Sequence, residues 1–151
     1  MKAVGKYKEY VIYALSEKET LQFKLIDVPI SAGFPSPALD YMEEELDLVK
    51  LFNLNSPTVY VIKVNGDSMR DAYIPSKALI AVDRNITPRD RHLVIAKLNR
   101  EFTLKRLLKT GAGWMLHPEN PEYDPYTIKP DDDFEVWGVV TRIFIDPNLY
   151  L

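Results

Sequence analysis

The sequence predicts a mainly β protein with one helix. Beyond residue 57, short runs rich in Val, Ile and aromatic residues alternate with turn-forming residues, which is typical of strands. Only the stretch between Ser36 and Val49 has apolar residues at helical spacing. The chain has 151 residues, of which 46% are hydrophobic and 27% charged. This composition and length indicate one folded domain with a sizeable core.

Six strands are expected in the second part of the chain. Asn99-Arg100 is a two-residue link between two of them, so those two strands are expected to form a hairpin. Asn120-Pro121 and the acidic run Asp131–Asp133 indicate loops, and the acidic run lacks the spacing of a cation-binding loop. The expected strands are Thr58–Val64, Leu79–Val82, Leu93–Leu98, Phe102–Leu108, Trp114–His117 and Phe134–Ile145.

The expected helix begins at Ser36, a good N-cap, with Pro37 in the first helical position. Apolar residues then recur three or four positions apart and face acidic residues across the helix. The spacing predicts one amphipathic helix of about three to four turns. The apolar positions are Leu39, Met42, Leu46 and Val49.

Residues 1–32 are predicted to form an arm that docks on the body of the protein. The segment carries five lysines and four acidic residues, a net charge of +1. Tyr10–Ala14 and Leu21–Leu25 have the composition of short extended pieces. The segment is too short for a three-helix DNA-reading module of the helix-turn-helix type.

Composition also excludes several classes of function. The chain has no cysteine, which excludes disulfides, thiol catalysis and cysteine-based zinc sites. No apolar run reaches the roughly 20 residues of a membrane helix, and no signal-peptide core follows the basic start. The net charge is −3, so unaided DNA binding is not expected. We therefore expect a cytoplasmic protein without a membrane association.

Ser68 is the first candidate functional residue. The run Val61–Val64 ends in Asn65-Gly66-Asp67, and the serine follows at once. Asn and Gly tolerate the positive φ of a sharp turn, so the serine hydroxyl is expected at a rigid strand end. An ordinary turn serine is the alternative interpretation, since short motifs carry a high false-positive risk.

A serine needs a base to become a nucleophile, and Lys105 is the candidate. In the expected strand it shares a face with Thr103 and Leu107. Desolvation between uncharged neighbours would lower the pKa of its amine, and a neutral lysine is a general base. The alternative is a surface lysine whose stem lies along the strand. The two histidines, His92 and His117, stand at strand ends in no pattern typical of a Ser-His-Asp triad.

Four motifs occur in an order that resembles the LexA/UmuD family of self-cleaving serine peptidases, with UmuD as the most similar branch. They are Gly33-Phe34-Pro35-Ser36-Pro37-Ala38 with Asp40-Tyr41, Gly66-Asp67-Ser68-Met69, Leu79–Asp83 and Glu101–Leu107. The resemblance extends over roughly residues 32 to 144. It implies twisted, largely antiparallel sheets, one short N-terminal helix and an extended N-terminal arm.

The resemblance also implies a reaction. Ser68 is implied as the nucleophile and Lys105 as the general base, with backbone N–H groups of Asp67 and Ser68 as the oxyanion hole. The cleaved bond falls at Ala32-Gly33, so residues 1–32 would be removed and residues 33–151 would form the mature peptidase domain. No cofactor or metal is implied.

The implied partners belong to the response to DNA damage. A RecA filament on single-stranded DNA would stimulate cleavage. The shortened product, as a homodimer, would join a UmuC-type polymerase of the Y family for translesion synthesis. Two alternatives remain open. One is a non-enzymatic interaction module associated with a polymerase, and the other is a LexA-like transcriptional regulator.

The sequence departs from the family mainly in turns. Gly-Asp pairs commonly precede two of the strands between the serine and the lysine. Lys77-Ala78 and Arg91-His92 stand in those places here, which leaves the local turn shape open. The arm before Ala32 is somewhat longer than is usual for UmuD. UmuD proteins typically have Cys-Gly at the cleaved bond and LexA repressors Ala-Gly, so a small residue precedes the glycine here as well.

Overall fold

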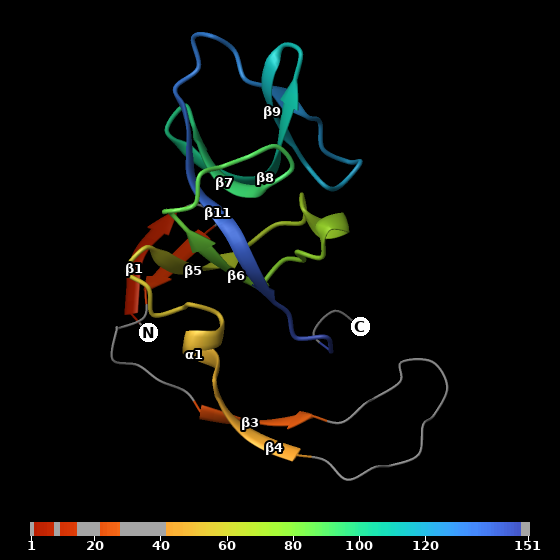
Figure 1. The fold of residues 1–151 in the computed structure, drawn as a ribbon. Coiled ribbons are helices and arrows are strands. Elements are labelled where there is room, and N and C mark those ends of the chain that lie inside the picture. The colour runs from red at the N-terminus through yellow and green to blue at the C-terminus, as the bar shows by residue number, and fades with distance from the viewer. Residues whose placement is uncertain (1, 8–9, 15–21, 28–41, 149–151) are drawn as a thin grey trace.

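The protein is mainly β, as expected (Figure 1). The computed structural model describes residues 2–7, 10–14, 22–27 and 42–148, with side chains from residue 47 onward. In these ranges the strands form one nine-stranded sheet and one two-stranded sheet, with antiparallel pairing between neighbours. Helix is limited to α1 (Leu48–Leu51) and the 3₁₀ turn η1 (Arg70–Ala72).

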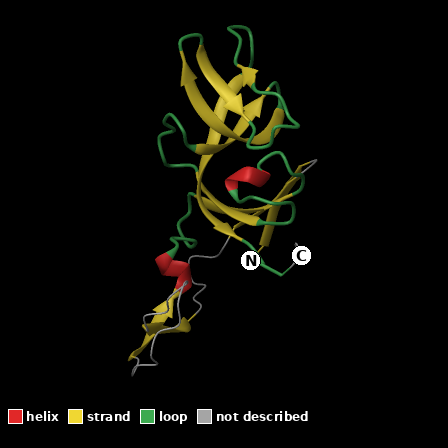
Figure 2. Ribbon diagram, turned by 90° about the vertical axis from the view of Figure 1, so that its right-hand side faces the viewer, coloured by secondary structure: helices red, strands yellow, loops and turns green. Residues whose placement is uncertain are grey.

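The large sheet has the strand order β1-β2-β5-β6-β11-β7-β8-β9-β10. Its strands are β1 (Lys2–Tyr7), β2 (Tyr10–Ala14), β5 (Val59–Val64), β6 (Leu79–Asp83), β7 (Leu93–Leu98), β8 (Glu101–Thr110), β9 (Gly113–His117), β10 (Tyr126–Thr127) and β11 (Phe134–Phe144). The small sheet pairs β3 (Gln22–Asp27) with β4 (Met42–Asp47). In Figures 1 and 2 this hairpin lies at one end of the molecule, beyond α1.

Strand β11 joins the two halves of the large sheet. Its first residues pair with β7 and its later residues with β6, so it runs between them in Figure 1. The register shifts between Val136 and Gly138 and again between Val140 and Arg142, as β-bulges do where a strand bends. A Cβ at Gly138 would lie 2.5 Å from Cγ1 of Val82. The close approach of β6 therefore requires glycine at this bulge.

The apolar side chains form two buried clusters. The first includes Ile62, Ile80 and Leu104 from β5, β6 and β8, together with Met69 and Ile74 from the segment between β5 and β6. The second includes Val94, Ala96, Leu107, Leu116 and Val139, from β7, β8, β9 and β11. Strands β7 and β8 contribute to both clusters because alternate residues point to opposite faces of a sheet.

The expected strands are confirmed to within two residues at each end. β7 begins and ends as predicted, and so does β2, which corresponds to the extended piece Tyr10–Ala14. The second extended piece lies within β3 apart from Leu21. β1 and the two-residue strand β10 were not predicted. β10 is short, and β1 contains Gly5, a residue that is depleted in strands.

The predicted helix is wrong over residues 42–47. Residues 36–41 lie outside the described residues, and Met42–Asp47 form strand β4; helix occurs only in the four residues of α1. β4 pairs with β3, which lies about 20 residues earlier in the sequence, and Lys24 stands opposite Glu45. This long-range ladder outweighs a local helical periodicity, which is a weak preference. Asp47 caps α1 by accepting hydrogen bonds from the N–H groups of Val49 and Lys50.

No helix in the described ranges is long and apolar enough to cross a membrane. The described parts of residues 1–32 are strands β1, β2 and β3. Backbone pairing of β2 with β5 joins that segment to the main sheet, in the order β1, β2, β5.

Six non-glycine residues of the described part of the chain lie in the left-handed region, and two of them stand in the turns that precede β6 and β7. Lys77 has φ 72° and Arg91 has φ 69°, and each stands where the resembling family commonly has glycine. Side chains with a Cβ are strained in this region by about 1 to 2 kcal/mol. Lys77 and Arg91 therefore replace glycine in these two turns, but the backbone still has the positive φ that favours glycine.

Substituting Lys77→Gly is expected to raise the free energy of unfolding by about 0.5 to 1 kcal/mol, because relief of strain exceeds the extra entropy of an unfolded glycine. Urea unfolding measures the change. The matched control is Lys109→Gly, at an exposed position within β8, which should lower stability. Equal losses in both variants would contradict the assignment of strain to Lys77.

Candidate functional site

Ser68 lies on a rigid turn that follows β5. Gly66 has φ 110°, a conformation that favours glycine, and its N–H donates to Oγ of Ser76 at 3.2 Å. The next residue after the serine, Met69, is 2% exposed and packs in the first buried cluster. The turn is thus fixed on both sides of the serine, as the strand-to-turn pattern of the sequence predicted.

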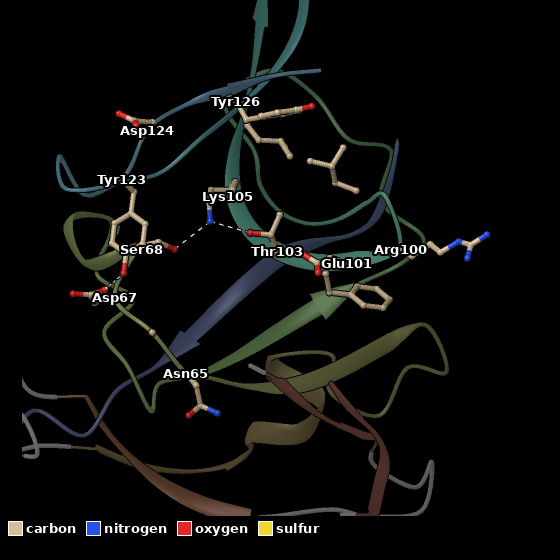
Figure 3. A pocket seen from close by; sticks show the side chains of 14 residues that line it. Asn65, Asp67, Ser68, Arg100, Glu101, Thr103, Lys105, Tyr123, Asp124 and Tyr126 are labelled. Carbon is tan, nitrogen blue, oxygen red and sulfur yellow. Dashed lines mark hydrogen bonds between the residues drawn. The ribbon is translucent and has the colours of Figure 1, made fainter. Parts of the chain in front are cut away.

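Lys105 extends from β8 toward this turn (Figure 3). Its Nζ lies 3.2 Å from Oγ of Ser68, 2.9 Å from Oγ1 of Thr103 and 3.0 Å from the carbonyl oxygen of Leu104. The side chain is partly buried. The structure therefore brings together the serine and the lysine that the sequence singled out, and it places Thr103 on the same side of β8, as the strand alternation predicted.

The Lys105 amine donates to each of the three oxygen atoms named above. A neutral lysine has two N–H donors and one lone pair, whereas the ammonium ion has three donors and no acceptor. Thr103 Oγ1 and the Leu104 carbonyl oxygen can accept the two N–H bonds. In the neutral form the lone pair would take the place of the donor to Ser68 Oγ, and this is the form that a general base requires.

The pair opens into a cleft of about 510 Å³. One side is the Ser68 turn, with Asn65 and Asp67, and the other is the β7–β8 hairpin, with Arg100 and Thr103. Leu98 and Phe102 also line the cleft. Leu116 and Tyr126 add apolar surface, and Arg100, Glu101 and Asp124 add charge. This volume lies within the range of about 300 to 1,000 Å³ that is common for ligand pockets.

The loop after β9 contacts the Ser68 turn. Asn120 donates from Nδ2 to the carbonyl oxygen of Asp67 at 2.9 Å, and Tyr123 donates from its hydroxyl to Oδ1 of Asp67 at 2.6 Å. From the sequence, this loop was recognisable only as a turn at Asn120-Pro121. Its role was missed because the partners are more than 50 residues apart in the sequence, and Asn-Pro is a common turn pair.

Tyr126 and Asp132 form a polar contact at the edge of the cleft. The hydrogen bond from Asn99, followed by that from the Lys129 N–H, holds the pKa of Asp132 below its usual range. The hydrogen bond to Asp132, together with burial and negative charge nearby, raises the pKa of Tyr126 above that of an ordinary tyrosine. Tyr126 therefore keeps its proton at moderately alkaline pH. The acidic run at residues 131–133 has a structural role here, since Asp132 accepts these bonds.

Neither histidine contacts the pair. His92 Nδ1 accepts a hydrogen bond from the Arg89 N–H at 3.2 Å. His117 pairs with Arg106 in the ladder between β8 and β9, so it lies on the face of the sheet opposite to Lys105. Its Nδ1 is buried without a hydrogen-bond partner among the described residues. The described part of the chain also contains no cluster of His, Cys, Asp and Glu that could hold a metal ion.

Ala32 and Gly33 fall in residues 28–41, outside the described residues. The structure therefore describes the cleft and the Ser68–Lys105 pair, and it leaves the proposed substrate segment undescribed.

The fold and the cleft define a class of protein: mainly β chains that hold a serine hydroxyl against a lysine amine. Residues 24–141 match the family model described as Peptidase S24-like. The chain is 39% identical over 118 residues to protein MucA of Salmonella typhimurium, covering 78% of this chain and 80% of MucA. It is 41% identical over 111 residues to protein SamA of the same species, covering 73% and 76%.

LexA repressors are similar over a smaller share of their length. The LexA repressor of Bordetella avium is 37% identical over 114 residues, which cover 76% of this chain and 53% of the repressor. The chain thus spans about half the length of that relative. These matches show that the chain belongs to the S24-like peptidases, the LexA/UmuD family of self-cleaving serine peptidases.

Proposed function

We propose that this protein cleaves its own chain between Ala32 and Gly33, with Ser68 as nucleophile and Lys105 as general base. The observation that carries the proposal is the 3.2 Å contact between Ser68 Oγ and Lys105 Nζ inside the cleft. Membership of a self-cleaving family supports it independently. A tethered substrate reacts at a high effective concentration, which suits a chain that carries its own scissile bond.

Acylation begins when the segment around Ala32 enters the cleft. The lone pair of Lys105 Nζ takes the Ser68 hydroxyl proton, and Oγ attacks the carbonyl carbon of Ala32. The N–H groups of Asp67 and Ser68 stabilise the negative oxygen of the tetrahedral intermediate, and each such donor contributes about 3 kcal/mol. The intermediate collapses as the C–N bond breaks, and the lysine ammonium returns the proton to the Gly33 amine.

Deacylation follows the same route with water. Lys105, neutral again, takes a proton from a water molecule that attacks the ester carbon. As the ester bond to Ser68 breaks, the lysine ammonium returns that proton to Ser68 Oγ. Thr103 and the Leu104 carbonyl orient the amine in both steps. The products are the arm, residues 1–32 with a new carboxylate, and the mature domain, residues 33–151 with a free amine.

The biological setting proposed here is the SOS response to DNA damage. A RecA filament on single-stranded DNA would favour the docked state of the substrate segment and so accelerate cleavage by population shift. The mature domain would then act as a homodimer that serves as accessory subunit of a UmuC-type, error-prone polymerase. The similarity to MucA and LexA repressors supports this setting.

Cleavage is expected to accelerate as pH rises, because only the neutral amine of Lys105 accepts the serine proton. Below the pKa of that amine the rate should rise about tenfold per pH unit and then level off. The test is the intact mass of the pure protein after incubation at a series of pH values from about 7 to 9. Tyr126 keeps its proton at moderately alkaline pH, so its ionisation does not produce the rise.

A rate indifferent to pH would count against a lysine base. A second measurement separates the catalytic proposal from a purely binding role: incubation with RecA, ATP and single-stranded DNA. A chain that stays whole under these conditions yet captures the polymerase would be a non-enzymatic interaction module. New termini at a bond other than Ala32-Gly33 would leave the Ser68–Lys105 chemistry in place and refute the cleavage site alone.

A further inference from the structure

We infer that Asn120 is a positioning residue that aims the Ser68 N–H at the oxyanion of the cleavage reaction. The inference rests on the proposed function, because it concerns the same reaction. It assigns a role to the loop after β9, which carries no residue of the proposed dyad. Three observations support it: the burial of Asn120, the orientation of its side-chain amide and the geometry of the peptide group that it holds.

Asn120 is an unusual residue in this structure. It is 3% exposed and is the sole buried polar side chain among the described residues. A buried amide is unfavourable unless its donors and acceptor are satisfied, so each contact of Asn120 matters. Its contacts are shared between its own loop and the Ser68 turn.

The orientation of the amide is fixed by its surroundings. Oδ1 accepts hydrogen bonds from the Glu122 N–H at 3.0 Å and from Arg70 Nη2 at 3.4 Å. A flipped amide would set its NH₂ group against these two donors. Nδ2 therefore faces the other way, where it donates to the carbonyl oxygen of Asp67 at 2.9 Å.

The Asp67 carbonyl controls the neighbouring N–H. The peptide group between Asp67 and Ser68 is planar and trans, so its N–H points away from its carbonyl oxygen. The carbonyl is held by two donors, Nδ2 of Asn120 and the Arg70 N–H at 3.1 Å. The Ser68 N–H itself donates to no acceptor among the described residues, so it is available to an oxyanion.

The same loop is also tied to the strand that carries the base. Glu119 pairs with Arg106, the residue after Lys105 on β8, and its carbonyl accepts from the Asp71 N–H at 2.8 Å. The loop therefore connects the serine turn to the lysine strand through side-chain and backbone contacts. Asn120 is the member of this connection that touches the peptide group of the nucleophile.

The test compares Asn120→Ala and Asn120→Asp with the unchanged chain. Neither variant can donate to the Asp67 carbonyl as the amide does, and the carboxylate also repels it. Loss of one oxyanion donor lowers rates about 100-fold or more, so a misaimed donor should lower the plateau cleavage rate by at least about tenfold. The pH midpoint of cleavage should stay where it is, because the Lys105 contacts are unchanged.

Val59→Ala is the control for general loss of stability. Val59 is buried at the start of β5, at the opposite end of that strand from the Ser68 turn. The Val59 variant should melt at a lower temperature while keeping its plateau rate. A shifted pH midpoint in the Asn120 variants, or a plateau loss in Val59→Ala as large as theirs, would overturn the positioning role.

A second readout does not depend on cleavage. The backbone amide resonance of Ser68 is followed by NMR in the unchanged protein and in the Asn120→Ala variant. We expect the chemical shift of this resonance to change, or the resonance to split, while the chemical shift of the Val94 amide in β7 stays the same. An unmoved Ser68 resonance refutes the inference whether or not the chain cleaves. A moved resonance in a chain that never cleaves upholds the positioning contact and refutes the proposed reaction instead.

Discussion

The variant Ser68→Ala is expected to stop cleavage at Ala32-Gly33, with a loss of about 10⁴-fold or more. Removing a serine nucleophile eliminates the covalent route, and only slow attack by water remains. The alanine should leave the fold intact, because Ser68 is partly exposed on a turn that Met69 anchors. Intact mass followed over time at alkaline pH measures the loss, and circular dichroism confirms folding.

Two further variants separate the role of the serine from nonspecific damage. Ser56→Ala removes a partly buried hydroxyl that contacts Thr58. Ser56 precedes β5 whereas Ser68 follows it, so this variant should change the rate by less than about twofold. Lys105→Arg keeps a long basic side chain but cannot act as a base, since arginine stays protonated. It should therefore be as inactive as Ser68→Ala. Continued cleavage in either site variant would refute the dyad.

The variant Ile80→Ala is expected to lower the free energy of unfolding by about 2 to 5 kcal/mol. Ile80 is fully buried in β6, opposite Ile62 of β5 and Ile143 of β11. Truncation removes three methyl or methylene groups from the first cluster and leaves a cavity that neighbouring strands cannot collapse to fill. Urea unfolding followed by fluorescence measures the loss.

Ile86→Ala is the matched control for this prediction. The same truncation occurs there in a loop, where the side chain is 37% exposed. Much of that side chain is already in contact with water, so the change should stay below about 1 kcal/mol. Similar losses at both positions would contradict the assignment of Ile80 to the centre of the core.

The strands could be predicted from the sequence because their residues meet two requirements together: a strand-forming composition, and a run of the right length between turns. β7 and β8 contain β-branched and apolar residues in runs bounded by turns, and each run is long enough to fill one strand. The helix prediction failed where only one requirement was met. Residues 42–47 have helical spacing, but the partner that decides their conformation, β3, lies about 20 residues earlier. Periodicity within a segment carries no information about such a partner.

The site shows the same division between local and distant information. Ser68 and Lys105 could be singled out because a turn motif and a strand position each have a local signature. Their 3.2 Å contact could not be predicted from those signatures, since it depends on how β5 and β8 are placed in the sheet. Asn120 has no local signature beyond a turn. Its importance follows from the carbonyl that it meets.

The strand order has a consequence for the fate of the severed arm. β1 and β2 belong to residues 1–32 but extend the large sheet beside β5, and β3 pairs with β4. Scission of one peptide bond would leave these ladders of hydrogen bonds in place. The fragment would then dissociate at a rate of its own. A partner that binds the edge of β5 could bind only after β2 has dissociated from it. Cleavage of the peptide bond and release of the fragment would thus be separate steps, each with its own rate constant.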